Sequence, residues 1–461
     1  MRARHGATCG RAPSCATALD LMTLRVLGIG ESCDLGEMYF RLAAAGHEVR
    51  VFVEDLDAHD VFGGMLARID DWRGQLPWVR QAGTQGIIVF ESALKGDLQD
   101  KLRRDGYRVI GGSAYGDRLE GDREFGQQVL RDLGLKTARL HRFTETGSAI
   151  DFVRANPARY VLKYNGADAA RSRNYVGEMD DGADIIALLS VRHDREAGNS
   201  PPDFVLMEHL RGVEVGVGAF FNGEHFLRPA CLDWEHKRFF PGDLGELTGE
   251  MGTIVTYRGA ETIFAATLAR MADKLRAGGY CGYINLNLIA NGQGLWPLEF
   301  TSRFGYPGYA ICEALHLESW DSIFFKMLGR ATGTIDTRAG YAAGVVLTVP
   351  PFPYSHGYAE LSKGLPVCFR DAMTSSQRRH LHLCEVASVR QQLVASGTTG
   401  CIGVATGAGD SIEAARQDAV ALAGQVVVPN LRYRKDIGQR LIDADFSTLR
   451  TLGYLPSSLR P

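Results

Sequence analysis

The chain has 461 residues, of which 45% are hydrophobic and 23% charged, and this composition excludes a disordered or fibrous protein. Its formal net charge of −3 argues against a surface that binds nucleic acid as a whole. No apolar run reaches the roughly 20 residues that cross a bilayer. We therefore expect a soluble, cytoplasmic protein with no nucleic-acid or membrane partner, built from several units of roughly 100–200 residues each.

Cysteine and histidine spacings give little sign of a metal site. The nine cysteines are scattered without a paired spacing, so buried free thiols are expected. His380-Leu-His382 could supply half of a metal site, but alone such a pair is more typical of a solvated strand face.

The N-terminal part begins with a segment that shows no periodicity. Residues 1–21 are rich in Arg, Ala and Cys and lack the apolar stretch of a secretory signal. We interpret them as disordered or as a start codon assigned too early, with a transit peptide as the alternative. Residues 22–120 then alternate strands and helices, which predicts an α/β domain whose parallel sheet is covered on both faces. The expected strands are Leu24–Gly30, Glu48–Val53, Gly86–Phe90 and Tyr107–Ile110, with a helix over Leu35–Ala45.

Residues 121–330 form a second unit of mixed helices and strands. The sequence predicts a helix over 122–133, the strand Tyr160–Lys163, a polar stretch of small residues over 165–174, a strand that carries Met207 and Glu208, the helix Glu261–Ala277, and the strands Tyr283–Ile289 and Leu295–Phe300. Residues 331–440 read as an α+β unit, and residues 441–461 as a tail.

Three positions in the second unit indicate phosphate and nucleotide chemistry. Lys163 ends a strand beside small residues, where a lysine can contact phosphate, although a surface lysine is the simpler alternative. Glu214 follows a short turn and can accept hydrogen bonds from ribose hydroxyls, unless the turn is merely solvated. Glu299 leaves an apolar strand four residues before Arg303, which suits a magnesium–phosphate site.

A series of motifs in one order makes these signals specific. They are Met207-Glu208-His-Leu-Arg-Gly-Val-Glu214, Glu235-His-Lys237-Arg238, Thr248-Gly-Glu-Met-Gly252, Glu299-Phe-Thr-Ser-Arg303-Phe-Gly-Tyr-Pro-Gly308, Gly409-Asp-Ser-Ile-Glu413 and Tyr433-Arg-Lys-Asp-Ile-Gly438. On these motifs the chain resembles the phosphoribosylamine–glycine ligase family of ATP-grasp enzymes from about Val26 to Gly438.

The resemblance implies a fold and an activity. The fold would comprise the N-terminal α/β domain, a two-lobed ATP-grasp domain over 121–330 and the C-terminal α+β domain. The activity would be the ATP-dependent joining of glycine to 5-phosphoribosylamine through an acyl-phosphate, as in purine biosynthesis. ATP and Mg2+ (or Mn2+) would be the cofactors, an amino acid and a phosphosugar amine the substrates, and the enzyme a monomer or homodimer.

The resemblance also implies roles for individual residues. The nucleotide would be held by Lys163 at the phosphates, by Arg123 at the position of an early lysine, by Glu208 and the following backbone at adenine, and by Glu214 at ribose. Lys237 and Arg303 would be catalytic. Glu299 would bind magnesium, together with Thr301, which replaces the family's asparagine, and with Asn287 on the neighbouring strand.

Departures from the family pattern fall mainly on the amine side. Glu31 and Asp34 stand where the family has a glycine–arginine loop for a sugar phosphate, and Tyr306 and Gly308 replace two acidic residues. A related ligase with another amine or amino acid, or a nucleotide-binding pseudoenzyme, therefore remains an alternative. A dinucleotide enzyme, suggested by Gly28-Ile-Gly30, is disfavoured because Cys33 stands where the fingerprint needs glycine.

Overall fold

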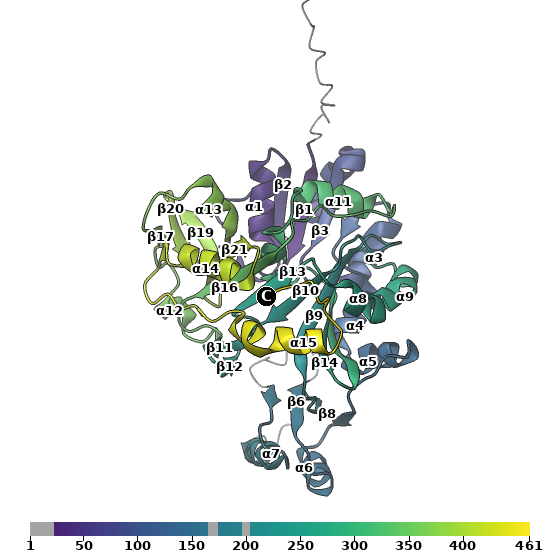
Figure 1. Ribbon diagram of the computed structural model, residues 1–461. Coiled ribbons are helices and arrows are strands. Elements are labelled where there is room, and N and C mark those ends of the chain that lie inside the picture. Colours follow the sequence, from purple (N-terminus) through teal and green to yellow (C-terminus); the bar gives the residue numbers. More distant parts are fainter. Residues whose placement is uncertain (1–22, 165–173, 196–202) are drawn as a thin grey trace, which may run out of the picture.

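The computed structural model describes residues 23–164, 174–195 and 203–461 (Figure 1). Residues 1–21, expected to be disordered or a misassigned start, lie outside the described residues, as does most of the small-residue stretch after Lys163. Among the described residues, no helix combines the length and the apolar character that crossing a bilayer requires.

The N-terminal sheet is parallel, as the alternation of strands and helices predicts. Its order is β2-β1-β3-β4, formed by β1 (Arg25–Gly30), β2 (Glu48–Val53), β3 (Gly86–Phe90) and β4 (Val109–Ile110). One face packs against α1 (Gly36–Ala44) and α11 (Trp320–Leu328), and the other against α2 (Leu76–Gln81) and α3 (Gly96–Arg104). Because α11 comes from the expected ATP-grasp span, the two units share this core.

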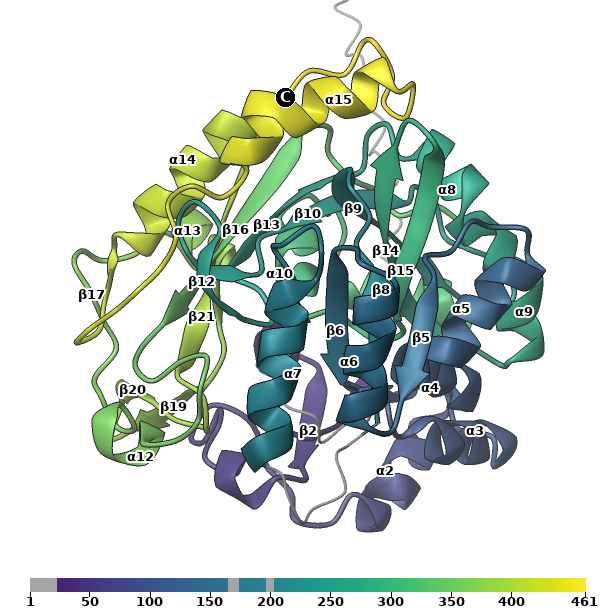
Figure 2. The ribbon, with the colours of Figure 1, turned by 90° about the horizontal axis from the view of Figure 1, so that it is seen from below.

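A small lobe projects from the body of the molecule. It is a four-stranded sheet of order β5-β8-β6-β7, from β5 (Leu140–Phe143), β6 (Tyr160–Tyr164), β7 (Tyr175–Val176) and β8 (Phe204–Glu208). Helices α6 (Thr146–Ala155) and α7 (Ala183–Arg195) cover one face (Figure 2). Leu162 and Tyr164 are buried beneath these helices. Lys163 lies between them in the strand, so it leaves on the opposite face.

The central sheet has eight antiparallel strands in the order β15-β14-β9-β10-β13-β16-β21-β18. They are β9 (Val213–Phe221), β10 (Cys231–Glu235), β13 (Gly252–Thr256), β14 (Gly282–Asn291), β15 (Gly294–Thr301), β16 (Tyr341–Thr348), β18 (Leu381–Leu383) and β21 (Cys401–Gly409). The sheet therefore continues across position 330, where the sequence places the start of a C-terminal domain.

Helices cover both faces of this sheet. One face carries α5 (Arg123–Asp132), α8 (Glu261–Ala266), α9 (Ala272–Ala277), α14 (Ile412–Ala423) and α15 (Phe446–Thr451), whereas α10 (Gly308–Glu313) packs on the other. The remaining elements are α4 (Ala114–Gly121), α12 (Tyr358–Leu361), α13 (Ser375–His380), β11 (Arg238–Phe240), β12 (Leu244–Leu247), β17 (Cys368–Phe369), β19 (Val386–Val389), β20 (Gln392–Ala395), β22 (Val426–Val427) and short turns η1 (Leu56–Ala58), η2 (Arg73–Gln75), η3 (Gly83–Gln85), η5 (Leu268–Met271) and η6 (Leu441–Asp445).

Two segments differ from the sequence prediction. The continuous helix expected over Glu261–Ala277 is wrong, because it breaks at Thr267, where φ is −130° and ψ −90°. The Thr267 hydroxyl donates to the Ile263 carbonyl at 2.6 Å. Threonine side chains readily form such hydrogen bonds to the backbone, which compete with the regular hydrogen bonds of a helix. The segment 441–461, read as a tail, contains η6 and α15 and buries Phe446 and Leu449 in the central core.

Candidate active site

Glu299, near the end of β15, lies at the centre of a group of cations. Its Oε2 accepts from Lys163 Nζ at 3.0 Å and from Arg123 Nη1 at 3.3 Å, and its Oε1 lies 3.9 Å from Lys237 Nζ. The three cations come from the small lobe, from the first residue of α5 and from the turn between β10 and β11. The carboxylate thus joins both lobes of the ATP-grasp span.

Lys237 extends this group into a second layer. Its Nζ lies 2.8 Å from Glu214 Oε1 and 3.0 Å from Glu235 Oε2. Asn287 Nδ2 donates to the same Glu214 oxygen at 2.9 Å and lies 3.5 Å from Glu235. We call these residues, Arg123, Lys163, Glu214, Glu235, Lys237, Asn287 and Glu299, the Glu299 network.

Strand register explains why the network forms on one face of the central sheet. Asn287 pairs with Glu299 across β14 and β15 and with Gly216 across β14 and β9, and Gly216 in turn pairs with Asp233. Residues paired directly across a sheet share a face. A Cβ at Gly216 would lie 2.1 Å from Asp233 Oδ1, so glycine leaves room for that carboxylate to lean across β9. Asp233 accepts from Asn285 Nδ2 at 2.6 Å.

Charge pairing decides the protonation of the network. Lys163 holds the pKa of Glu299 far below its ordinary value, against the effect of burial, with help from Lys237 and Arg123. Burial lowers the pKa of Lys163. Burial also opposes the charge on Lys237, but Glu214 and Glu235 outweigh it and raise that pKa well above its ordinary value. Each carboxylate of the network therefore lies next to a cation of opposite charge.

Three predicted site residues lie outside the network. Glu208 is the exposed last residue of β8, at the start of the turn that joins the small sheet to the central one. Thr301 lies opposite Asn285 at the end of β15. Arg303 follows β15 and donates from Nε to Glu120 Oε1 at 3.0 Å, while the Ser302 amide donates to Glu120 Oε2.

Sequence reasoning missed the acidic partners Glu235 and Glu120. Glu235 stands two residues before Lys237 in the motif Glu235-His-Lys237-Arg238, and its alternation with Asp233 along β10 is the signal that both carboxylates share one face. Glu120 gives no such signal, because its partner Arg303 lies 183 positions further along the chain.

The loop after β1 faces the end of β15 and is acidic. Burial raises the pKa of Glu31, and Asp34, Lys95, Glu54 and Arg303 all lie close enough to influence it. Below the loop, the Asp34 amide donates to Glu91 Oε2 at 2.9 Å. Burial, followed by the nearby Asp34, raises the pKa of Glu91 to about 8. The carboxyl ends of the parallel strands therefore present acidic groups beside Arg303.

The side chains of this site could hold magnesium only together with a bound nucleotide. Among the described residues, no group of three or more His, Cys, Asp or Glu side chains is arranged to hold a metal ion. Glu299 and Asn287 provide a carboxylate and an amide oxygen on neighbouring strands. Mg2+ is commonly bound by one or two carboxylates together with substrate phosphates and waters, so these residues fit a site completed by a nucleotide.

His380, the last residue of α13, and His382 in β18 differ from their prediction as a solvated strand face. His382 is 1% exposed and buried against the core, and burial lowers its pKa well below the ordinary value. His380 Nδ1 lies 3.0 Å from Thr406 Oγ1. The thiols behave as expected, since Cys33, Cys231, Cys281, Cys312, Cys384 and Cys401 are free and buried, although Cys368 is exposed.

Known proteins resemble this chain over much of its length. Residues 121–309 match the model of the phosphoribosylglycinamide synthetase ATP-grasp (A) domain. The phosphoribosylamine–glycine ligase of Nostoc sp. is 26% identical over 387 residues, which cover 81% of this chain and 88% of that protein. The same enzyme of Neisseria meningitidis serogroup B is 24% identical over 435 residues, 91% of this chain and 100% of that protein.

A longer relative and two solved structures extend the comparison. The trifunctional purine biosynthetic protein adenosine-3 of Drosophila pseudoobscura pseudoobscura is 28% identical over 406 residues, 84% of this chain, but the chain spans only 29% of that protein.

The crystal structure of phosphoribosylamine–glycine ligase from Thermotoga maritima has a TM-score of 0.70 at 20% identity, covering 90% of this chain and 100% of that one. The biotin carboxylase domain of Hydrogenobacter thermophilus 2-oxoglutarate carboxylase has a TM-score of 0.63 at 10% identity, covering 94% and 98%, and at these identities both structures show the fold alone. The chain is thus similar to phosphoribosylamine–glycine ligases over most of its length, and its residues 121–309 match the ATP-grasp domain of phosphoribosylglycinamide synthetase.

Proposed function

We propose that the chain is an ATP-dependent carbon–nitrogen ligase that joins glycine to 5-phosphoribosylamine in purine biosynthesis. The observation that carries the proposal is the Glu299 network, in which three cations from three parts of the ATP-grasp span meet one carboxylate. The names of the relatives supply the two substrates.

The chemistry has two steps. The glycine carboxylate attacks the terminal phosphorus of ATP, which gives an acyl-phosphate and ADP. The amine then attacks the acyl carbon, phosphate leaves, and the nitrogen loses a proton as the amide forms. Both steps require that the negative charge of the polyphosphate be neutralised while water is kept away.

Lys163, Arg123 and Lys237 are suited to hold the phosphates. Each is held in place by Glu299 or by the acidic residues next to it. A polyphosphate can take over these positive charges and thereby release Glu299 toward a metal ion. Magnesium would be held by Glu299 and Asn287, with Thr301 at the end of the same strand, and when bound it would neutralise phosphate charge.

Glu214 and Glu208 are suited to the nucleoside. Glu214 lies on β9 at the far side of Lys237, 2.8 Å from its Nζ, and its second oxygen can accept from ribose hydroxyls. Glu208 and the turn after it connect the two sheets, where adenine would lie against the backbone. Arg303, held by Glu120, would lie beside the amine and the acyl group.

The acidic loop after β1 favours a second candidate, a related ligase with a different amine. Glu31 and Asp34 lie near Arg303, and Glu120 is paired with it, so acidic groups outnumber this arginine. An amine without a phosphate would meet less repulsion there than 5-phosphoribosylamine.

One assay separates the candidates. ADP release and amide formation are measured with ATP, magnesium, glycine and 5-phosphoribosylamine, and in parallel with a panel of other amines and amino acids. Ligation of glycine to 5-phosphoribosylamine above the panel supports the first candidate, and a preference for another amine supports the second. Tight ATP binding without turnover for any pair would instead indicate a nucleotide-binding pseudoenzyme.

A further inference from the structure

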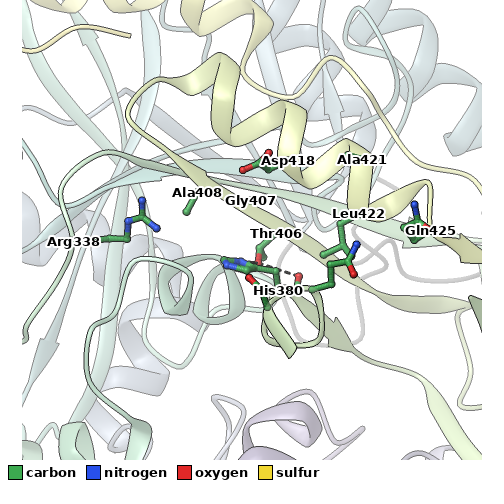
Figure 3. Close-up of a pocket in the computed structure, with 11 residues that line it drawn as sticks. Arg338, His380, Thr406, Gly407, Ala408, Asp418, Ala421, Leu422 and Gln425 are labelled. Carbon is green, nitrogen blue, oxygen red and sulfur yellow. Dashed lines mark hydrogen bonds between the residues drawn. The ribbon is translucent and has the colours of Figure 1, made fainter. Parts of the chain in front are cut away.

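A cavity of about 390 Å³ lies in the C-terminal part of the molecule, between α13, β21 and α14 (Figure 3). Its polar lining includes Arg338, Gln377, His380, Thr406, Asp418 and Gln425. Among its described lining residues, none belongs to the Glu299 network. Pockets for small ligands commonly measure ~300–1,000 Å³, so this one suits a small metabolite.

The cavity contains two opposite charges that are not paired with each other. Arg338 and Asp418 are both exposed, and neither forms an ion pair or a side-chain hydrogen bond within the described residues. In Figure 3, Arg338 lies at one end of the cavity, while Asp418 on α14 lies opposite His380. A ligand that carries one positive and one negative group could therefore reach both charges.

The His380 ring provides a hydrogen-bond acceptor in the cavity. Its two contacts with Thr406 determine which ring nitrogen carries the proton. The Thr406 hydroxyl donates to the His380 carbonyl at 3.1 Å, and this uses its one hydrogen. Thr406 Oγ1 therefore accepts from His380 Nδ1–H at 3.0 Å, and Nε2 keeps its lone pair. Burial lowers the pKa of His380, helped by Arg41, Arg379 and Arg338, so the ring is neutral at neutral pH.

Gln425 supplies an acceptor that lacks a partner. Its Oε1 is shielded from solvent and makes no hydrogen bond in the described part of the chain. Buried polar atoms are seldom left without a hydrogen-bond partner, because each unsatisfied group costs free energy. The cavity thus offers carboxylate, imidazole and amide acceptors together with one guanidinium.

We infer that this cavity binds a free α-amino acid as its zwitterion. The ammonium group supplies the N–H donors that Asp418 and His380 Nε2 require, and Arg338 holds the carboxylate in the paired geometry that guanidinium groups favour. This site is separate from the one that would ligate glycine and does not depend on the proposed reaction.

The test uses the full chain labelled with 13C at histidine Cε1. The His380 signal is assigned by its loss in His380→Gln, and glycine is then titrated while that signal is followed. We expect a saturable shift whose midpoint rises about tenfold or more in Arg338→Gln and in Asp418→Asn, as for the loss of a charged hydrogen bond. Arg379 is an exposed cation of α13, the helix that ends at His380, but it does not line the cavity. Arg379→Gln should therefore leave the midpoint unchanged.

Methylamine and acetate are titrated as single-charge probes. Each should bind more weakly than glycine by about tenfold or more. A His380 signal that never moves, a shift that survives both cavity substitutions, or acetate binding as tightly as glycine would each overturn the inference. The exposed positions of Arg338 and Asp418 allow these variants to fold, and the remaining histidine signals verify that they do.

Discussion

Glu299 Oε2 accepts a hydrogen bond from Lys163 Nζ at 3.0 Å, although 136 positions separate the two residues. The contact joins β6 of the small lobe to β15 of the central sheet. Because the Glu299 side chain is only 34% exposed, water screens this pair less than a surface pair. The two lobes therefore meet through one charge pair at the place where the polyphosphate would lie.

The first prediction concerns this pair. In Glu299→Gln, Lys163 and Arg123 lose their shared carboxylate, and burial then lowers the pKa of Lys163 further. Magnesium-dependent ADP release should be lost, while the circular dichroism spectrum stays that of the wild type. Glu261→Gln, which removes an exposed carboxylate paired with Arg228, is the control and should retain activity. Full turnover of Glu299→Gln at the wild-type magnesium concentration would exclude Glu299 as a ligand.

The second prediction concerns Lys237. Lys237→Met removes the charge that compensates both Glu214 and Glu235, so these carboxylates would oppose the incoming polyphosphate. We expect ATP binding to weaken by about 2 kcal/mol or more, the scale of a lost charged hydrogen bond, as measured by calorimetry. Lys101→Met, which breaks an exposed ion pair with Asp105 on α3, is the matched control. Unchanged ATP affinity in Lys237→Met would remove Lys237 from the phosphate site.

The network also indicates how far the sequence could predict this molecule. The resemblance implies that Arg123, Lys163, Glu214, Lys237, Asn287 and Glu299 share one site, and in the structure these residues lie together. The parallel N-terminal sheet was likewise predicted from the alternation of strands and helices.

Features that depend on distant pairing could not be predicted. The Glu120–Arg303 pair joins positions 183 apart, and no local pattern links them. The central sheet continues because β16 pairs with β13. A single sequence does not show which of several strands will pair with β13. The helix breaks at Thr267, where one side-chain hydroxyl donates to the Ile263 carbonyl. The hydrophobic pattern of the segment does not indicate this single hydrogen bond.

The third prediction concerns stability against pH and depends on Glu91. Its pKa of about 8 lies above the ordinary value of 4.5, so between these values the folded chain holds a proton that the unfolded chain has released. The free energy of unfolding should therefore fall as pH rises through this window, by at most about 1.4 kcal/mol per pH unit from this group.

Glu91→Gln removes this dependence. Its amide oxygen can still accept from the Asp34 amide, as Glu91 Oε2 does at 2.9 Å. Urea unfolding at several pH values between 5 and 8 should give a flatter profile for Glu91→Gln than for the wild type. Glu360→Gln, at an exposed position of α12, should reproduce the wild-type profile, and parallel profiles for all three proteins would show that Glu91 titrates normally.

The last prediction concerns the amine. Glu31 and Asp34 lie near Arg303, and two carboxylates near a phosphate dianion each oppose its binding by roughly 1 kcal/mol in water and by more when shielded. Burial already raises the pKa of Glu31, so a further negative charge nearby would be costly. Replacing Glu31 by Ser and Asp34 by Asn should lower the KM for 5-phosphoribosylamine and leave the KM for ATP unchanged, since neither residue belongs to the Glu299 network. Replacing Glu54, an exposed partner of Lys95 that also lies near Glu31, by Gln tests whether acidic charge on this edge matters in general. If the wild type already saturates tightly with 5-phosphoribosylamine and the double substitution impairs it, the two carboxylates contact the amine rather than repel it.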